Sequence, residues 1–203
     1  MATTWSASNK STHVTLTGSN LIATADGTTA DVNGRSDTSV SGSQRIFWVM
    51  TFNAGGGTDN GMGIANASWT FADGSFMGLD AFLSLGYYTT GNVFLNNGLA
   101  AAIATYTVGA VLGVALDRGA DKVWFFNGTN WNNDVIGNQN PAVGSQVGGI
   151  TTGITGALFP AYEVSNLTAN GQWTLNAGAT VLPYPIPTGF STFDDTILSQ
   201  SVM

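Results

Sequence analysis

Val111-Leu112-Gly113-Val114-Ala115-Leu116-Asp117 and Lys122-Val123-Trp124-Phe125-Phe126 are the two runs with the strongest structural signal in the chain. The first run alternates small residues with larger apolar ones, and a period of two is the pattern of a half-buried β-strand. The second run is aromatic and β-branched, which also favours a strand. Because only Arg118-Gly119-Ala120-Asp121 separates the two runs, the sequence predicts a β-hairpin with a short loop.

The same short-range pattern continues toward both ends of the chain. Helices are poorly supported, since Glu163 is the only Glu and Gly or Asn interrupts most windows of helical length. One stretch, 99–104, is predicted to form a helical turn or two. About ten short strands at spacings near ten residues indicate an all-β sandwich or barrel. Besides the hairpin, the predicted strands are 14–17, 45–52, 61–65, 81–88, 92–95, 158–164 and 172–176.

The composition of the 203 residues excludes several classes of site. There is no Cys, which excludes disulfides and thiolate metal sites, and the single His13 excludes sites that need several histidines. Five Lys and Arg stand against twelve Asp and Glu, which gives a net charge of −7. That balance argues against nucleic acid and anionic membrane surfaces as partners, because both are bound through positive charge. The 43% of hydrophobic residues is enough to build a core.

Membrane insertion is not expected. The chain starts without a basic segment followed by an apolar one, so we expect no signal peptide and synthesis in the cytoplasm. No charge occurs between Asp80 and Asp117, but Tyr, Thr, Asn and Gly interrupt this stretch. It therefore lacks the run of about 20 apolar residues that a membrane-spanning helix needs.

Several short motifs follow one another in a characteristic order. They are TWS at 4–6, GMGIA at 61–65, YTVGAVLGVALD at 106–117, KVWFFNGTNW at 122–131, LFPA at 158–161, TLNAG at 174–178 and PTGF at 187–190. This series resembles the SPRY domain, a concanavalin A-like antiparallel β-sandwich of the jelly-roll type. One departure is Ala110, where that family usually has Asp. The resemblance implies a single SPRY-like domain over residues 1–190, followed by a tail at 191–203, and a role as a protein-interaction module.

Catalysis is not expected, although concanavalin-like folds also include glycoside hydrolases. Glycoside cleavage normally uses two carboxylates about 5–9.5 Å apart. This chain offers only Glu163, and Asp194 and Asp195 would face opposite ways on a strand. A Ser-His-Asp triad would have to use His13, and no G-x-S-x-G motif is present. We therefore predict no catalytic residues and no cofactor.

Calcium is the one metal that the sequence brings into question. The segment Asp31-Val32-Asn33-Gly34-Arg35-Ser36-Asp37 places oxygen-bearing side chains at alternate positions. Hard cations accept such ligands, but the pattern lacks the distal Glu of an EF-hand and contains Arg35. Asn, Asp and Gly also gather in ordinary turns. We therefore assign no metal site here.

The candidate ligand-binding residues are aromatic and amide side chains in loop-like sequence. The apolar face of an aromatic ring stacks on sugar C–H groups while amides bind the hydroxyls. In contrast, Trp48, Trp124 and Trp173 lie within strand patterns and are predicted to be core residues. The candidate binding residues are Trp69, Tyr87, Tyr88, Trp131, Asn132 and Asn133.

The tail contains a second set of candidate contact residues, Phe193, Ile197 and Leu198, which are more apolar than a solvated tail requires. They are predicted to dock on another protein, and the alternative is that the tail packs on its own sandwich. With little charge and a sandwich that fills the chain, the favoured function is a non-enzymatic virion or cell-surface subunit of the phage or bacterial type, such as a fibre, spike or decoration protein. Its partners would be copies of itself or other proteins of that assembly. The alternatives are a lectin-like glycan-binding protein and a free-standing cytoplasmic interaction domain.

Overall fold

The predicted hairpin forms strands β10 (Val111–Asp117) and β11 (Lys122–Phe126). In the computed structural model, which describes residues 2–29, 31–56, 59–132, 138–164 and 170–194, the two strands pair antiparallel from Gly113↔Phe126 to Asp117↔Lys122. On its other side, β10 pairs with β5 (Arg45–Ala54). The larger residues of β10, such as Val114, are buried in the core between the sheets. The small ones face outward, where a Cβ on Gly113 would come within 2.8 Å of the Phe47 ring.

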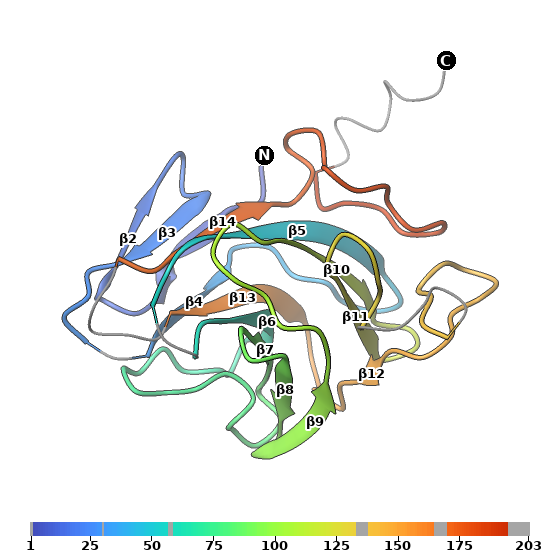
Figure 1. Cartoon of the computed structure of the whole chain (residues 1–203), viewed down its shortest axis with the longest axis horizontal. Coiled ribbons are helices and arrows are strands. Elements are labelled where there is room, and N and C mark those ends of the chain that lie inside the picture. Colours follow the sequence, from blue (N-terminus) through green and yellow to red (C-terminus); the bar gives the residue numbers. More distant parts are fainter. Residues whose placement is uncertain (1, 30, 57–58, 133–137, 165–169, 195–203) are drawn as a thin grey trace.

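The chain is an antiparallel β-sandwich of two seven-stranded sheets (Figure 1), which confirms the predicted fold class. None of the described residues lies in a helix. In sheet A the strand order is β1 (Trp5–Lys10), β4 (Val32–Ser36), β13 (Leu158–Val164), β6 (Gly61–Asn66), β7 (Ser84–Tyr88), β8 (Asn92–Leu95) and β9 (Gly98–Ala102). In sheet B it is β12 (Ile150–Thr151), β11, β10, β5, β14 (Gln172–Asn176), β3 (Ile22–Ala25) and β2 (Val14–Thr17).

Apolar side chains pack in three layers, one between the sheets and one on the outer face of each sheet. The central layer contains Trp48 and Trp173, which are fully buried as predicted. Trp124 is also fully buried, but it lies on the outer face of sheet B, where the segment 179–190 covers it. The segment 67–83 covers the outer face of sheet A in the same way. Both covering segments place rings directly against strand residues, so neither outer face is an open surface at these positions.

The structure corrects one local prediction. Residues 98–102 form β9 rather than a helical turn, because Asn96 and Asn97 both adopt positive φ and turn the chain back along β8.

The segment Asp31–Asp37, to which no metal site was assigned, has the buried strand β4 at its centre, between β1 and β13. There the Asn33 amide donates to Ser75 O at 2.9 Å, and Arg35 Nη1 donates to Asn66 O at 3.2 Å.

Other differences are smaller. The strand predicted from residue 81 begins at Ser84, and β1, β3 and β12 were not among the strands predicted from alternation. No helix long and apolar enough to cross a bilayer occurs among the residues that the structure places.

Candidate functional site

Four of the predicted binding residues are rings, and the structure buries all of them. Trp69, Tyr87, Tyr88 and Trp131 are at most 8% exposed. Trp69 belongs to segment 67–83 and packs in the same outer layer as Tyr88, whereas Tyr87 lies in the central core. A sugar could stack on these faces only after the covering segments had moved away, because stacking needs an open ring face.

Trp131 and Asn132 lie at the end of β11. The Trp131 ring packs on Phe126, with centroids 4.8 Å apart, under the segment 179–190. Asn132 Oδ1 accepts a hydrogen bond from Phe125 N at 2.9 Å, and Asn132 Nδ2 donates to Gln139 Oε1 at 3.1 Å. Asn133 lies outside the described residues. Of this predicted group, Asn132 is therefore the residue that the structure places in a cavity wall.

The described part of the predicted tail lies against the sandwich. The Phe193 ring is 5.8 Å from that of Trp48, and Ser191 forms a parallel bridge with Ile46. Asp194 Oδ1 accepts from Thr3 N at 2.9 Å. Ile197 and Leu198 lie outside the described residues. Phe193 thus makes its contacts within its own chain, and docking of the tail on another protein stays a prediction.

Glu163 is the one Glu of the chain, and it is fully buried on the outer face of sheet A. Its Oε2 accepts from Met77 N at 2.5 Å and lies 2.7 Å from the Tyr88 hydroxyl. Burial raises the pKa of Glu163 well above its usual value, and this outweighs the two hydrogen bonds. The side chain therefore favours the neutral form and is closed off from solvent by segment 67–83. Within the described ranges, no group of three or more His, Asp or Glu side chains is placed to hold a metal ion.

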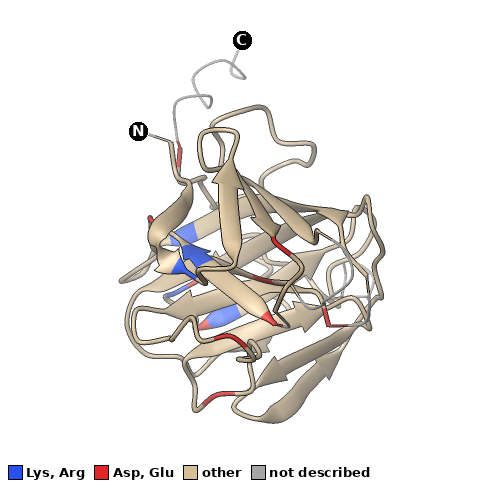
Figure 2. Ribbon diagram, turned by 90° about the vertical axis from the view of Figure 1, so that its left-hand side faces the viewer, with Lys and Arg blue, Asp and Glu red and all other residues tan. Residues whose placement is uncertain are grey.

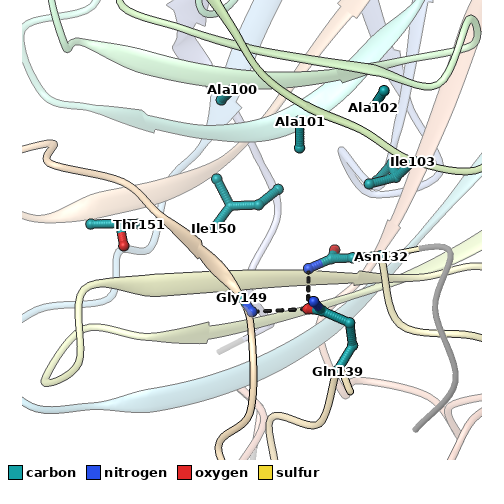
Figure 3. A pocket seen from close by; sticks show the side chains of 9 residues that line it. All are labelled: Ala100, Ala101, Ala102, Ile103, Asn132, Gln139, Gly149, Ile150 and Thr151. Atoms are coloured by element: carbon teal, nitrogen blue, oxygen red, sulfur yellow. Dashed lines mark hydrogen bonds between the residues drawn. The ribbon is translucent and has the colours of Figure 1, made fainter. Parts of the chain in front are cut away.

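A cavity of about 510 Å³ opens on one lateral side of the sandwich, between the edge strands β9 and β12 (Figure 3). Both strands are the last of their sheets, and they end on the same side of the molecule (Figure 1). The volume lies within the range of about 300–1,000 Å³ that is typical of ligand pockets. Nine of the described residues line the cavity, and none of these nine is charged: they are Ala100, Ala101, Ala102, Ile103, Asn132, Gln139, Gly149, Ile150 and Thr151.

Two kinds of side chain form the walls of this cavity. Ala101, Ile103 and Ile150 are partly buried and pack against the central core, which gives an apolar floor. At one end, Gln139 Oε1 accepts from both Gly149 N at 2.9 Å and Asn132 Nδ2. Gly149 has φ +81°, and a Cβ there would lie 2.5 Å from the Trp124 ring, so glycine lets this loop approach β11 closely. The fixed amide pair and the aliphatic floor together make a preformed, neutral site.

Sequence reasoning found one residue of this site, Asn132, and missed the rest. The available signal was the absence of charge from Asp80 to Asp117, which raised the question of a membrane helix instead. That stretch supplies the whole β9 side of the cavity. The β12 side of the cavity comes from a separate Gly-rich segment. The two segments come to face each other only in the folded chain.

Comparison with known proteins identifies the fold. No protein-family model matches the chain, and no curated protein matches it in sequence. The SPRY domain of human HERC1 superposes with a TM-score of 0.68 and 13% identity, over 87% of this chain and 99% of that one. The fold is SPRY-like.

Two further structures agree with this result. The PSpry domain of TRIM65 gives a TM-score of 0.57 at 12% identity, over 86% of this chain and 92% of that one. Stonustoxin gives 0.61 at 16% identity and 86% coverage of this chain, which spans only 27% of the toxin chain. At these identities the likeness shows the SPRY-like fold alone, so the function has to be argued from this chain's own surface.

Proposed function

We propose that this chain is a non-catalytic protein-interaction module that acts as a subunit of a larger assembly, such as a virion or a cell surface. The observation that carries the proposal is the cavity between β9 and β12, an open site with an aliphatic floor and no charged side chain among the described residues that line it. Interface centres are poor in charge and rich in apolar contacts, so a surface of this kind suits a lasting contact with another protein.

The charge of the chain supports the same proposal. With a net charge of −7, free subunits repel one another and remain dispersed. The described residues that line the cavity are uncharged, so a partner can contact them without burying a charged group among them. Such a contact depends on apolar burial and hydrogen bonds, and it should therefore respond weakly to salt.

The surroundings of Glu163 are the reason for proposing a non-catalytic role. A carboxyl group that is closed off beneath segment 67–83, and that already accepts from Met77 N, has no access to a substrate. The proposal accordingly assigns binding to the cavity and a structural role to Glu163.

The test is native co-fractionation of the tagged full chain from its source, at about 0.1 M and about 1 M NaCl. The expected result is that the chain elutes with specific partner proteins, well above the size of a monomer, at both salt concentrations. A chain that elutes as a monomer in both buffers would contradict the proposal. So would elution with partners only at the lower salt concentration, because the contact would then depend on charge.

A further inference from the structure

The backbone of β9 is free on the side that faces the cavity. β9 pairs only with β8, and it is the last strand of sheet A. Ile103 N donates to Gly91 O at 2.8 Å, toward the β8 side. Because successive N–H groups of a strand point to opposite sides, the N–H and C=O of Ala102 point away from β8. No described residue hydrogen-bonds to these two groups.

The edge of β12 repeats this arrangement across the cavity. Thr152 N donates to Asp121 O at 3.1 Å, toward β11, so the N–H and C=O of Thr151 point away from β11. Ala102 and Thr151 both line the cavity. The cavity thus lies between two strand edges whose free backbone groups lack partners among the described residues.

The side chains at this edge leave room for another strand. Residues 100–102 are all Ala, β9 contains neither charge nor Pro, and Leu99 next to them is 58% exposed. Natural proteins usually protect an edge of this kind with charges, Pro or a covering segment. Among the described residues, the polar side chains in the lining are Asn132, Gln139 and Thr151. An amide such as that of Gln139 can donate to the carbonyl group of a bound chain.

We propose that an extended, uncharged peptide segment of a partner protein binds in this cavity as an added β-strand, hydrogen-bonded to the free edge of β9 at Ala102. Its inward side chains would contact Ile103 and Ile150, and one of its ends would meet the amide pair of Asn132 and Gln139. The proposal rests on the proposed function and identifies the kind of partner. A strand fits better than a sugar, because the free groups are main-chain donors and acceptors and no exposed ring lines the cavity.

The test uses a displayed library of random twelve-residue peptides, selected on the immobilised full chain. The strongest peptide is then synthesised with its normal backbone and with N-methylated amides. We expect uncharged, β-branched peptides to be enriched. N-methylation should weaken binding by about tenfold or more, because it removes main-chain donors. Binding should also slow hydrogen exchange of the Ala102 amide.

Two variants at one position locate the site. Ala102→Pro removes an N–H that points outward, and such a position at a sheet edge tolerates Pro. It should weaken peptide binding by about tenfold, whereas Ala102→Val, which keeps the N–H, should bind as the wild type does. Circular dichroism of both variants checks that the fold is retained. If Ala102→Pro does not fold, two measurements on the wild type still test the site: the affinity of the N-methylated peptide and the hydrogen exchange of the Ala102 amide.

Each remaining outcome speaks against the proposal in a distinct way. Peptides that bind Ala102→Pro and the wild type equally would place the site elsewhere and leave the proposed function standing. If Ala102→Pro changes only self-association, measured by light scattering, the occupant is a second copy of the chain. A chain that enriches no peptide and also elutes as a monomer from its source would defeat both proposals.

Discussion

The two lateral sides of the sandwich end differently, although each consists of one edge strand from each sheet. On the side of β1 and β2, the outward groups of Val14 are occupied: its N–H donates to Ser11 O at 3.3 Å, and its C=O accepts from Lys10 Nζ at 2.6 Å. Trp5 N in β1 likewise donates to Asn20 O at 2.9 Å. Figure 2 shows this side, with basic residues on the strands that face the viewer.

Among the described residues, no comparable hydrogen bonds occupy the outward backbone groups on the side of β9 and β12. β9 carries Ala, Leu and Gly and β12 carries Ile and Thr, so neither strand contains Lys, and a cavity takes the place of the covering contacts. A free strand edge tends to pair with another chain, so proteins protect the edges that should remain alone. This difference between the two sides is the basis for proposing that a partner binds at the β9 side. Four predictions test this comparison, from the largest effect to the smallest.

The first prediction concerns the core on both sides. Trp173 on β14 lies toward the β2 side, and Trp124 on β11 lies next to β12; both are fully buried. Trp173→Ala and Trp124→Ala should each lower the free energy of unfolding by about 3–5 kcal/mol, since each empties a large aromatic site. Urea denaturation measures this. Similar losses would show that the two sides differ at their edges and not in their packing, whereas unchanged melting temperatures would show that both rings are accessible.

The second prediction concerns Glu163. A reactive carboxylate there would contradict the comparison of the two sides, because the function would then lie away from the β9 and β12 side. Its pKa in the folded chain lies above the usual value of 4.5 because the group is buried. The unfolded chain therefore ionises first, and the free energy of unfolding should fall as the pH rises above about 4.5. In Glu163→Gln this fall should be smaller.

Denaturation at about pH 5 and about pH 8 measures the effect. Glu163→Ala is the control: it removes the acceptor of Met77 N and should lower stability at both values. Hydrolysis of β-glucans should be absent in the wild type, and turnover abolished by Glu163→Gln would overturn the non-catalytic assignment.

The third prediction removes one protecting contact. Lys10→Met keeps the aliphatic stem but loses the hydrogen bonds to Val14 O and Ser11 O. Stability should fall by about 1 kcal/mol, and self-association should increase because the β2 edge becomes free. Lys122→Met is the matched control, since Lys122 Nζ donates to Gly148 O at 2.7 Å in a loop rather than at an edge. Equal self-association of the two variants, measured by light scattering, would refute edge protection by Lys10.

The fourth prediction has the smallest effect and lies at the end of the β2–β3 hairpin. The hydroxyl and N–H of Thr28, followed by His13, lower the pKa of Asp26 to about 2. The stabilisation is present above the unfolded value of 3.8 and is lost as the pH falls toward 2. Thr28→Val should raise this pKa toward 3.8 more than His13→Gln does. Carboxyl shifts in an NMR titration measure both, and a larger rise in His13→Gln would reverse the assignment.

Local patterns predicted the central strands of the sandwich better than its short and edge strands, since β1, β3 and β12 were not predicted. The alternation in 111–117 and the aromatic run at 122–126 gave β10 and β11, because side chains of a strand must suit two different faces. The helix prediction for residues 99–104 was wrong. An Ala-rich run favours a helix locally, but the turn at Asn96 and Asn97 places this run beside β8, where it forms a strand. The strand β4 within Asp31–Asp37 was not predicted, because its polar residues do not alternate with apolar ones and are buried only by the strands on either side.

The candidate site divides in the same way. The sequence alone predicted the β-sandwich and the burial of Trp48, Trp124 and Trp173. Both follow from local periodicity and from the free energy of burying apolar area. Which aromatic rings are covered depended on where segments 67–83 and 179–190 lie across the sheets. The position of β9 opposite β12 across one cavity was decided only in the folded chain, because the two strands are about fifty residues apart and share no sequence pattern. Long-range packing therefore placed the proposed binding side.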